Sequence, residues 1–137
     1  MPTPHETHLA SASKTGKLRL LLVDESPTVR QELRNNLEQL EGIEIVAETD
    51  RDDRALDLFF RLRPEVVVVS TCLPVHGGFE VLRCIKRAVP RCAVVLTGRS
   101  PNHFIAEAAR LLGASGVCPA VNGFAELSAI LQSLQSN

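Results

Sequence analysis

The sequence contains no tryptophan, no tyrosine and a single methionine, and its formal net charge is only −1. Because 15 basic side chains face 16 acidic ones, no positive field is available to hold nucleic acid or an anionic membrane. The apolar runs are far shorter than the roughly 20 residues that cross a bilayer, and the polar first residues contain no apolar signal-peptide core. The sequence therefore predicts a cytoplasmic protein that contacts neither nucleic acid nor membrane.

Cysteine is also scarce, and its four copies stand in no metal-binding or redox spacing. They form no CxxC pair, and the four histidines do not accompany them as zinc ligands would. We expect reduced, mostly buried and inert thiols, Cys72 and Cys118 included. This pattern predicts no metal centre and no cofactor.

The length of 137 residues corresponds to one ordinary domain. Residues 1–16 show no apolar period, which predicts a flexible N-terminal leader. Residues 17–137 alternate short aliphatic runs with amphipathic segments, a pattern typical of β-α units around a parallel sheet. The domain is therefore expected to span residues 17–137.

Five aliphatic runs predict five strands, at 18–23, 43–47, 66–69, 92–96 and 116–118. An amphipathic segment follows each run, and the Ser26-Pro27 and Ser100-Pro101 pairs read as helix caps with proline in the first turn. Right-handed crossovers then predict a flavodoxin-like (βα)5 α/β fold, a doubly wound parallel sheet with strand order 2-1-3-4-5. In such a fold the functional crevice lies beyond the carboxyl ends of the strands.

Polar or small residues stand at these predicted strand ends. They are Asp24 and Glu25 after the first strand, Ser70 after the third, Thr97 after the fourth and Ala120 after the fifth. The carboxyl ends of parallel strands meet at one edge, so we expect these residues to gather there.

Five segments, in order and at consistent spacing, carry a family resemblance: LLVDESP at 21–27, RPEVVV at 63–68, LP at 73–74 with GFEVL at 78–82, VVLT at 94–97 and GASG at 113–116. Together they resemble the CheY-like receiver domain of bacterial response regulators, over about residues 18–134. In that family an aspartate ending the third strand accepts a phosphoryl group from a histidine kinase. An acidic pair and a nearby backbone group hold magnesium, while a Thr or Ser and a Lys bind the phosphoryl oxygens.

The resemblance assigns Asp24, Glu25 and Thr97 to their family roles and the Cys72 backbone to the magnesium site. It places Ser70 where the phosphoacceptor stands. Ungapped spacing places Ala120 where the lysine stands, whereas a two-residue gap would place Cys118 there. The family's movable aromatic on the fifth strand corresponds to Val117.

Register shifts do not restore the missing groups, because the last aspartate is Asp57 and the last lysine is Lys86. A neutral serine hydroxyl is a far weaker nucleophile than a carboxylate, and no lysine offsets the developing charge. We therefore expect a degenerate receiver, or pseudo-receiver, that is not an enzyme and binds magnesium weakly at most.

The resemblance also implies action through protein contact in a two-component or phosphorelay pathway. The partner would be a histidine kinase, another regulator or a second copy of the chain. The expected partner face lies on the fourth helix, fifth strand and fifth helix and comprises His103, Ala106, Glu107, Arg110, Val117 and Asn122. Two alternatives remain open: Ser70 as a weak or atypical phosphoacceptor, and a small-molecule site at the flavodoxin-like crevice.

Overall fold

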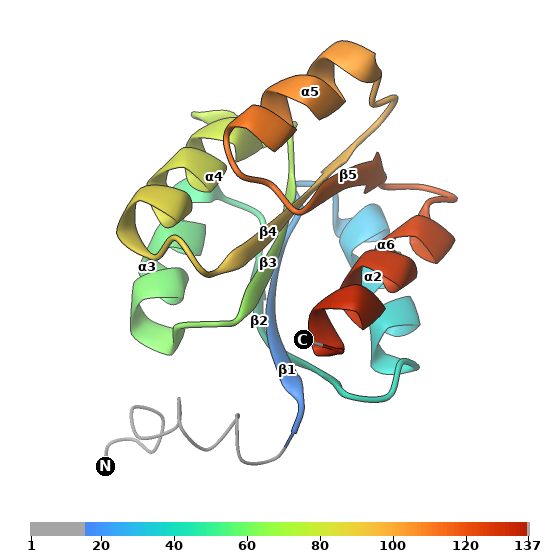
Figure 1. Ribbon diagram of the computed structural model, residues 1–137. Coiled ribbons are helices and arrows are strands. Elements are labelled where there is room, and N and C mark those ends of the chain that lie inside the picture. Colours follow the sequence, from blue (N-terminus) through green and yellow to red (C-terminus); the bar gives the residue numbers. More distant parts are fainter. Residues whose placement is uncertain (1–15, 137) are drawn as a thin grey trace.

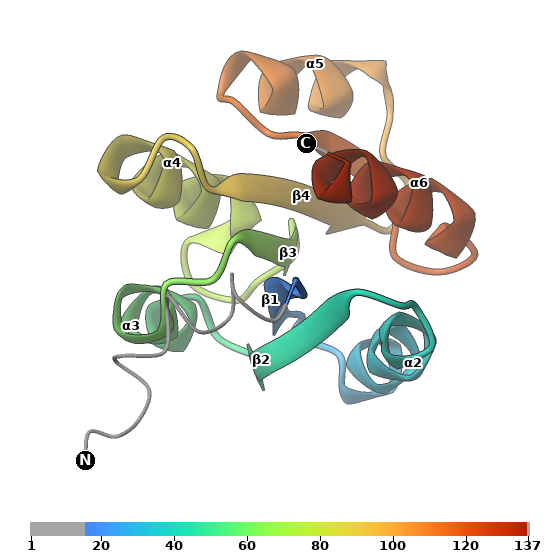
Figure 2. The ribbon, with the colours of Figure 1, turned by 60° about the horizontal axis from the view of Figure 1, so that its bottom comes forward.

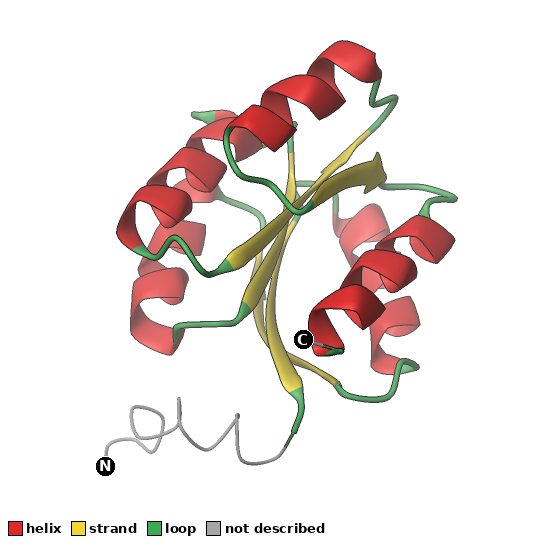
Figure 3. Ribbon diagram, viewed as in Figure 1, coloured by secondary structure: helices red, strands yellow, loops and turns green. Residues whose placement is uncertain are grey.

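The computed structural model describes residues 16–136, and these form the expected alternation of strands and helices (Figures 1 and 3). The strands are β1 (Leu18–Val23), β2 (Ile43–Thr49), β3 (Val66–Ser70), β4 (Ala93–Gly98) and β5 (Gly116–Pro119). The helices are α2 (Pro27–Glu38), α3 (Asp52–Leu62), α4 (Gly77–Ala88), α5 (His103–Leu111) and α6 (Phe124–Gln135). All strand pairings are parallel, and the order is β2-β1-β3-β4-β5. The predicted flavodoxin-like α/β fold is confirmed, while positions 1–15 of the predicted leader lie outside the described residues.

Helices cover both faces of the sheet, with α2 and α6 on one side and α3 and α4 on the other (Figure 2). Strand alternation separates two cores: Leu20 and Leu22 of β1 pack with α2 and α6, whereas Leu21 and Val23 pack toward α3, α4 and α5. The central strand β3 is buried along its whole length. Its uninterrupted valines therefore fit a strand that is covered on both faces.

Helix starts were predicted correctly in one case and wrongly in another. Ser26 Oγ accepts a hydrogen bond from the Val29 N–H at 3.2 Å, and Pro27 follows in the first turn of α2, as expected. The Ser100-Pro101 prediction is wrong, because α5 is capped by Asn102, whose Oδ1 accepts from the Ile105 N–H at 3.0 Å. A serine hydroxyl and an asparagine amide oxygen can both accept this hydrogen bond, so the sequence alone does not decide between Ser100 and Asn102.

Among residues 16–136, no helix is both long and apolar enough to cross a bilayer.

Candidate functional site

A pocket of about 120 Å³ opens at the carboxyl edge of the sheet. Its wall is formed by Asp24, Glu25, Ser26, Val29, Ser70, Cys72, Gly98, Arg99, Ala120 and Val121. Asp24, Glu25, Ser70 and Ala120, predicted from strand ends far apart in the sequence, thus share one pocket. Thr97 is buried beside this wall, at the β4 position paired with Ser70 of β3.

The two carboxylates of the acidic pair, Asp24 and Glu25, differ in how their oxygens are hydrogen-bonded. Asp24 is only 2% exposed, and its Oδ1 accepts a hydrogen bond from the Ser26 N–H at 2.8 Å. Burial raises the pKa of the Asp24 carboxyl, and repulsion from Glu25 acts in the same direction. One carboxylate oxygen of Glu25, Oε1, is buried without a hydrogen-bond partner in the described structure. The pair therefore concentrates negative charge that the surrounding protein only partly neutralises.

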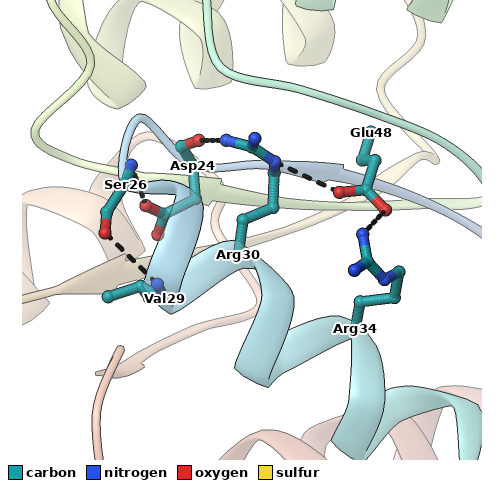
Figure 4. Close-up of polar contacts among 6 residues, drawn as sticks. All are labelled: Asp24, Ser26, Val29, Arg30, Arg34 and Glu48. Atoms are coloured by element: carbon teal, nitrogen blue, oxygen red, sulfur yellow. Dashed lines mark hydrogen bonds and ion pairs between the residues drawn. The ribbon is translucent and has the colours of Figure 1, made fainter.

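A side-chain network fixes the loop that carries this pair to the edge strand β2 (Figure 4). Arg30 of α2 donates through Nη1 to the main-chain oxygen of Asp24 at 2.6 Å and through Nε to Glu48 at 3.1 Å. Arg34, one helical turn later, donates to the other oxygen of Glu48 at 2.9 Å. Only Arg30 reaches both Glu48 and the loop, so it couples the position of Asp24 to β2.

At the end of β3, Ser70 is 4% exposed and its Oγ accepts a hydrogen bond from the Cys72 N–H at 3.0 Å. The backbone of Gly78 lies so close that a Cβ there would collide with the Ser70 carbonyl. The Thr97 hydroxyl is buried without a hydrogen-bond partner in the described part of the chain. A polar atom in that state costs free energy, which makes the Ser70–Thr97 strand ends an incompletely satisfied region.

The end of β5 contributes almost no polar chemistry. The Ala120 N–H donates to the Gly98 oxygen at 2.9 Å, but its side chain offers only a methyl group. The basic side chain among the lining residues is Arg99, directly after β4, which sequence analysis did not single out. The folded arrangement identifies it, because the β4–α5 connection contributes to the pocket wall.

The expectation that Cys72 is buried is wrong, because Cys72 is exposed on the rim of the pocket. It follows Ser70 by two residues, where the chain has already left the sheet. Cys118, in contrast, is buried in β5, and burial raises the pKa of its thiol to about 11. The predicted burial of Cys118 is therefore confirmed, and the raised pKa disfavours the reactive thiolate form.

The loop after β3 is also held by a residue that sequence analysis missed. Asp52, at the start of α3, is 2% exposed, and its Oδ2 accepts from the His76 N–H at 2.5 Å. Its Oδ1 accepts from the Asp53 N–H at 3.0 Å. Asp52 thus ties the segment that contains Cys72 to α3.

The residues predicted for the partner face differ in how exposed they are to solvent. His103, Ala106, Arg110 and Asn122 are exposed, while Glu107 is half-buried beside Arg110. Val117 is half-buried and packs against the core that faces α3, α4 and α5. The outer surface of α5 is instead dominated by Phe104 and Leu111, which were not predicted.

Comparison with known proteins agrees with this geometry. The family model "Response regulator receiver domain" matches residues 20–132. Protein CcdB of Bacillus subtilis is 32% identical over 94 residues, which cover 68% of this chain and 78% of that protein. Response regulator GacA of Pseudomonas aeruginosa is 32% identical over 79 residues, covering 58% of this chain and 37% of GacA.

Longer relatives and solved structures extend the comparison. A protein-glutamate methylesterase/protein-glutamine glutaminase of Hahella chejuensis is 36% identical over 78 residues, covering 57% of this chain but only 22% of that protein. The crystal structure of a LuxR-family two-component response regulator from Aurantimonas sp. has a TM-score of 0.81 at 28% identity, covering 88% of this chain and 86% of that one. The isolated receiver domain of RcsB from Salmonella enterica also has a TM-score of 0.81, at 22% identity, covering 88% of this chain and 90% of that one.

The fold, the pocket at the strand ends and the family match define a receiver domain of the two-component response-regulator type. The chain belongs to the response regulator receiver domain family. It spans about a fifth of the methylesterase and just over a third of GacA.

The pocket contains only part of the set of ligands that the family uses to bind magnesium. Asp24 and Glu25 supply two carboxylates, and the unpartnered Glu25 Oε1 is a natural ligand for a hard cation. The third position is a neutral hydroxyl that already accepts from the Cys72 N–H. Among residues 16–136 there is no cluster of three or more His, Cys, Asp or Glu placed to hold a metal. The donors that the pocket offers to a divalent cation are thus the two carboxylates of Asp24 and Glu25, with the remaining positions left to water.

Proposed function

We propose that this chain is a pseudo-receiver, which acts through protein contact in a cytoplasmic bacterial two-component pathway and does not depend on phosphoryl transfer. The single observation that carries the proposal is Ser70. It ends β3 and lines the same pocket as Asp24 and Glu25, at the position that the resemblance gives to the family's phosphoacceptor aspartate.

The chemistry of the pocket supports this proposal. Attack on a phosphoryl donor needs a nucleophile, and the neutral Ser70 hydroxyl would have to lose its proton first. Ala120 supplies no positive charge to the developing transition state. Arg99 lines the same pocket, but it follows β4 and not β5, so the lysine position itself is uncharged.

The alternative in which Ser70 is a weak phosphoacceptor has one supporting feature. Asp24 lies in the same pocket with a raised pKa, which suits a general base better than an ordinary aspartate would. The small-molecule alternative is less well supported, because 120 Å³ is well below the roughly 300–1,000 Å³ of typical ligand pockets.

An amide NMR titration tests the proposal, with magnesium added first and beryllofluoride second. We expect weak, non-saturating shifts near Asp24 and Glu25 with millimolar magnesium, because two carboxylates hold the ion loosely. Beryllofluoride should add nothing, since it needs a carboxylate at position 70. Saturable shifts around Ser70 and Thr97 after beryllofluoride would refute the proposal.

The proposed partners are a histidine kinase, another regulator or a second copy of this chain. They follow from membership in the receiver family, and the exposed surface of α5 is a candidate contact site. A pull-down with the unmodified chain, repeated with and without acetyl phosphate, should recover the same partner under both conditions. A partner that binds only after acetyl phosphate would contradict independence from phosphorylation.

A further inference from the structure

A second pocket lies at the amino edge of the sheet, at the opposite end of the strands from the acidic pair. Its volume is about 550 Å³, within the roughly 300–1,000 Å³ of typical ligand pockets. It opens where β1, β3 and β4 begin and where α3 and α4 end, two helices that lie side by side on one face of the sheet (Figure 2). Its wall includes Arg19, Arg63, Arg91, Glu65, Phe59 and Val89, and we refer to it as the amino-edge pocket.

Arg19 is a charged residue within β1, and it is only 5% exposed. Its Nη1 donates to the main-chain oxygens of Leu62 at 2.7 Å and Arg63 at 3.0 Å, so it caps the carboxyl end of α3. Its Nε and Nη2 have no hydrogen-bond partner among residues 16–136. Because a buried charge is normally paired with an opposite charge, the wall of this pocket contains a cation whose partner the described chain does not supply.

Arg63 is held in position beside the same pocket. Its guanidinium carbon lies 5.8 Å from the centre of the Phe59 ring and 5.3 Å from the centre of the Phe60 ring. Both distances are within the range of cation–π attraction. Since the side chain is already restrained by the two rings, binding a ligand costs it less conformational entropy than it would cost a fully mobile arginine.

The arginines of the amino-edge pocket also differ from the others in their pairing. Within residues 16–136, six arginines form ion pairs with carboxylates: Arg30, Arg34, Arg51, Arg61, Arg83 and Arg110. Of the six that form none there, three line this one pocket. Glu65 lines it too, but its Oε1 accepts from the main-chain N–H of Arg19 at 2.9 Å and not from a guanidinium. The pocket is therefore a local excess of positive charge in a chain whose formal net charge is −1.

Three arginines against one glutamate leave an excess that matches a phosphomonoester, which carries about −1.5 to −2 near neutral pH. The planar guanidinium also binds phosphate oxygens through two parallel N–H groups. Glu65 Oε2 accepts no hydrogen bond among residues 16–136, so it can accept one from a ligand hydroxyl. Phe59 and Val89 add an apolar wall for the rest of the ligand. A nucleoside monophosphate combines these three features: a phosphate, hydroxyl groups and a planar ring.

We propose that the amino-edge pocket binds a small phosphomonoester with the chemistry of a nucleoside monophosphate. The three arginines hold its phosphate, and its planar body lies against the apolar wall. The proposal goes beyond the proposed function and does not depend on it, because no residue lines both this pocket and the pocket of Asp24 and Ser70.

An amide NMR titration with adenosine 5′-monophosphate tests the proposal, in low-salt buffer without phosphate or magnesium. We expect saturable shifts at Arg19, Glu65 and Val89, with a dissociation constant of about 1 mM or lower, and none at Asp24 or Ser70. Adenosine should give no saturable shifts, because it lacks the charge. Inorganic phosphate should shift the same amides but bind at least tenfold more weakly, because it makes no contact with the apolar wall.

Three glutamine variants show which arginines are responsible. Arg63→Gln and Arg91→Gln each remove one charge from an exposed side chain, so both should fold and bind the nucleotide at least fivefold more weakly. Arg54→Gln is the matched control. Arg54 is also exposed and forms no ion pair within residues 16–136, but it lies near the start of α3, at the other edge of the sheet. This variant should bind as the unmodified chain does, and circular dichroism checks that all three fold.

Three outcomes would overturn the proposal. The first is the absence of saturable shifts at up to about 10 mM nucleotide. The second is equal weakening by all three variants, which would indicate general attraction of an anion to positive surface charge. The third is equal affinity for inorganic phosphate and the nucleotide, which would indicate an ion site without a place for the organic body. None of these outcomes bears on whether Ser70 accepts a phosphoryl group, so the proposed function is tested separately.

Discussion

The hydroxyl oxygen of Ser70 accepts a hydrogen bond from the main-chain N–H of Cys72 at 3.0 Å, so the last side chain of β3 is part of the turn that leaves the strand. The carboxylate oxygens of an aspartate at the same position would lie one bond farther from the main chain, in the pocket that Asp24 and Glu25 also line. Position 70 therefore supports the loop locally and brings no negative charge to the pocket. The Ser70 side chain thus stabilises the turn after β3 and supplies no carboxylate for phosphoryl chemistry.

Restoring the two missing groups should restore cation binding. Ser70→Asp adds the third carboxylate, and Ala120→Lys adds the positive charge at the end of β5. We expect the Ser70→Asp/Ala120→Lys variant to bind magnesium at least tenfold more tightly than the unmodified chain, measured by amide NMR titration. The control is Ser70→Asn combined with Ala120→Lys. It lacks the added negative charge at position 70, so it should bind magnesium no more tightly than the unmodified chain.

Arg30 should matter more than Arg34, although both pair with Glu48. Arg30 also donates to the Asp24 oxygen at 2.6 Å, and a charged donor to a carbonyl is a comparatively strong hydrogen bond. We expect Arg30→Gln to lower the free energy of unfolding by about 1–2 kcal/mol. Arg34→Gln should cost less than about 0.5 kcal/mol, because it removes only a partly exposed ion pair. Urea denaturation checks both, and equal losses would mean that the contact with Asp24 has no special role.

Asp24→Asn should stabilise the protein at neutral pH. Burial raises the folded-state pKa of Asp24, so the folded chain binds that proton more tightly than the unfolded chain does. Stability is therefore lost as pH rises from the unfolded pKa through the folded pKa, and the ionised carboxylate destabilises the fold above it. The asparagine keeps an oxygen for the Ser26 N–H and carries no charge.

Thermal unfolding in the presence of a chelator measures this effect. The Asp24→Asn variant should melt a few degrees higher at pH 7, and the difference should shrink as the pH falls through the raised folded-state pKa of Asp24 and vanish below the unfolded-state pKa. Asp53→Asn is the opposite control, because a hydrogen bond from Arg51 lowers the pKa of Asp53. It should not raise the melting temperature, and a lower melting temperature for Asp24→Asn at pH 7 would contradict this account.

Gly78 should not tolerate a side chain. A Cβ at this position would meet the Ser70 carbonyl, which is main chain and cannot swing away. We expect Gly78→Ala to lower the free energy of unfolding by about 1–3 kcal/mol, despite the better helix propensity of alanine. Gly98→Ala is the control for this substitution. A Cβ at position 98 would lie nearest the Thr71 hydroxyl, at 3.2 Å, and that side chain can move away. A Gly78→Ala variant as stable as the parent would show that α4 does not press against the end of β3.

The strand order and the clustering of Asp24, Glu25, Ser70 and Ala120 could be predicted because they follow from local patterns. Continuous aliphatic runs mark covered strands, and parallel strands bring their carboxyl ends to one edge. The exposure of Cys72 could not be predicted in this way, since it depends on the path of the chain after β3. The contribution of Asp52 was missed for the same reason, because its partner His76 is 24 residues away.

The solvent-exposed apolar side chains of α5 were also not predicted. Apolar residues at helical spacing usually face the core, yet Phe104 and Leu111 point outward and Ala109 points inward. The partner face was predicted from the family resemblance; it included Val117, which is half-buried against the core, and omitted the two most exposed large apolar side chains of residues 16–136. Only the placement of α5 on the sheet resolves which of its faces is free.

The most direct test of the pseudo-receiver proposal is the intact mass of the unmodified chain after incubation with magnesium and acetyl phosphate. The Ser70→Asp/Ala120→Lys variant, treated in parallel, shows whether the scaffold can still accept a phosphoryl group. We predict no mass increase for the unmodified chain, with an adduct on the variant. A phosphoryl adduct on the unmodified chain that maps to Ser70, and that is lost in Ser70→Ala, would contradict the account.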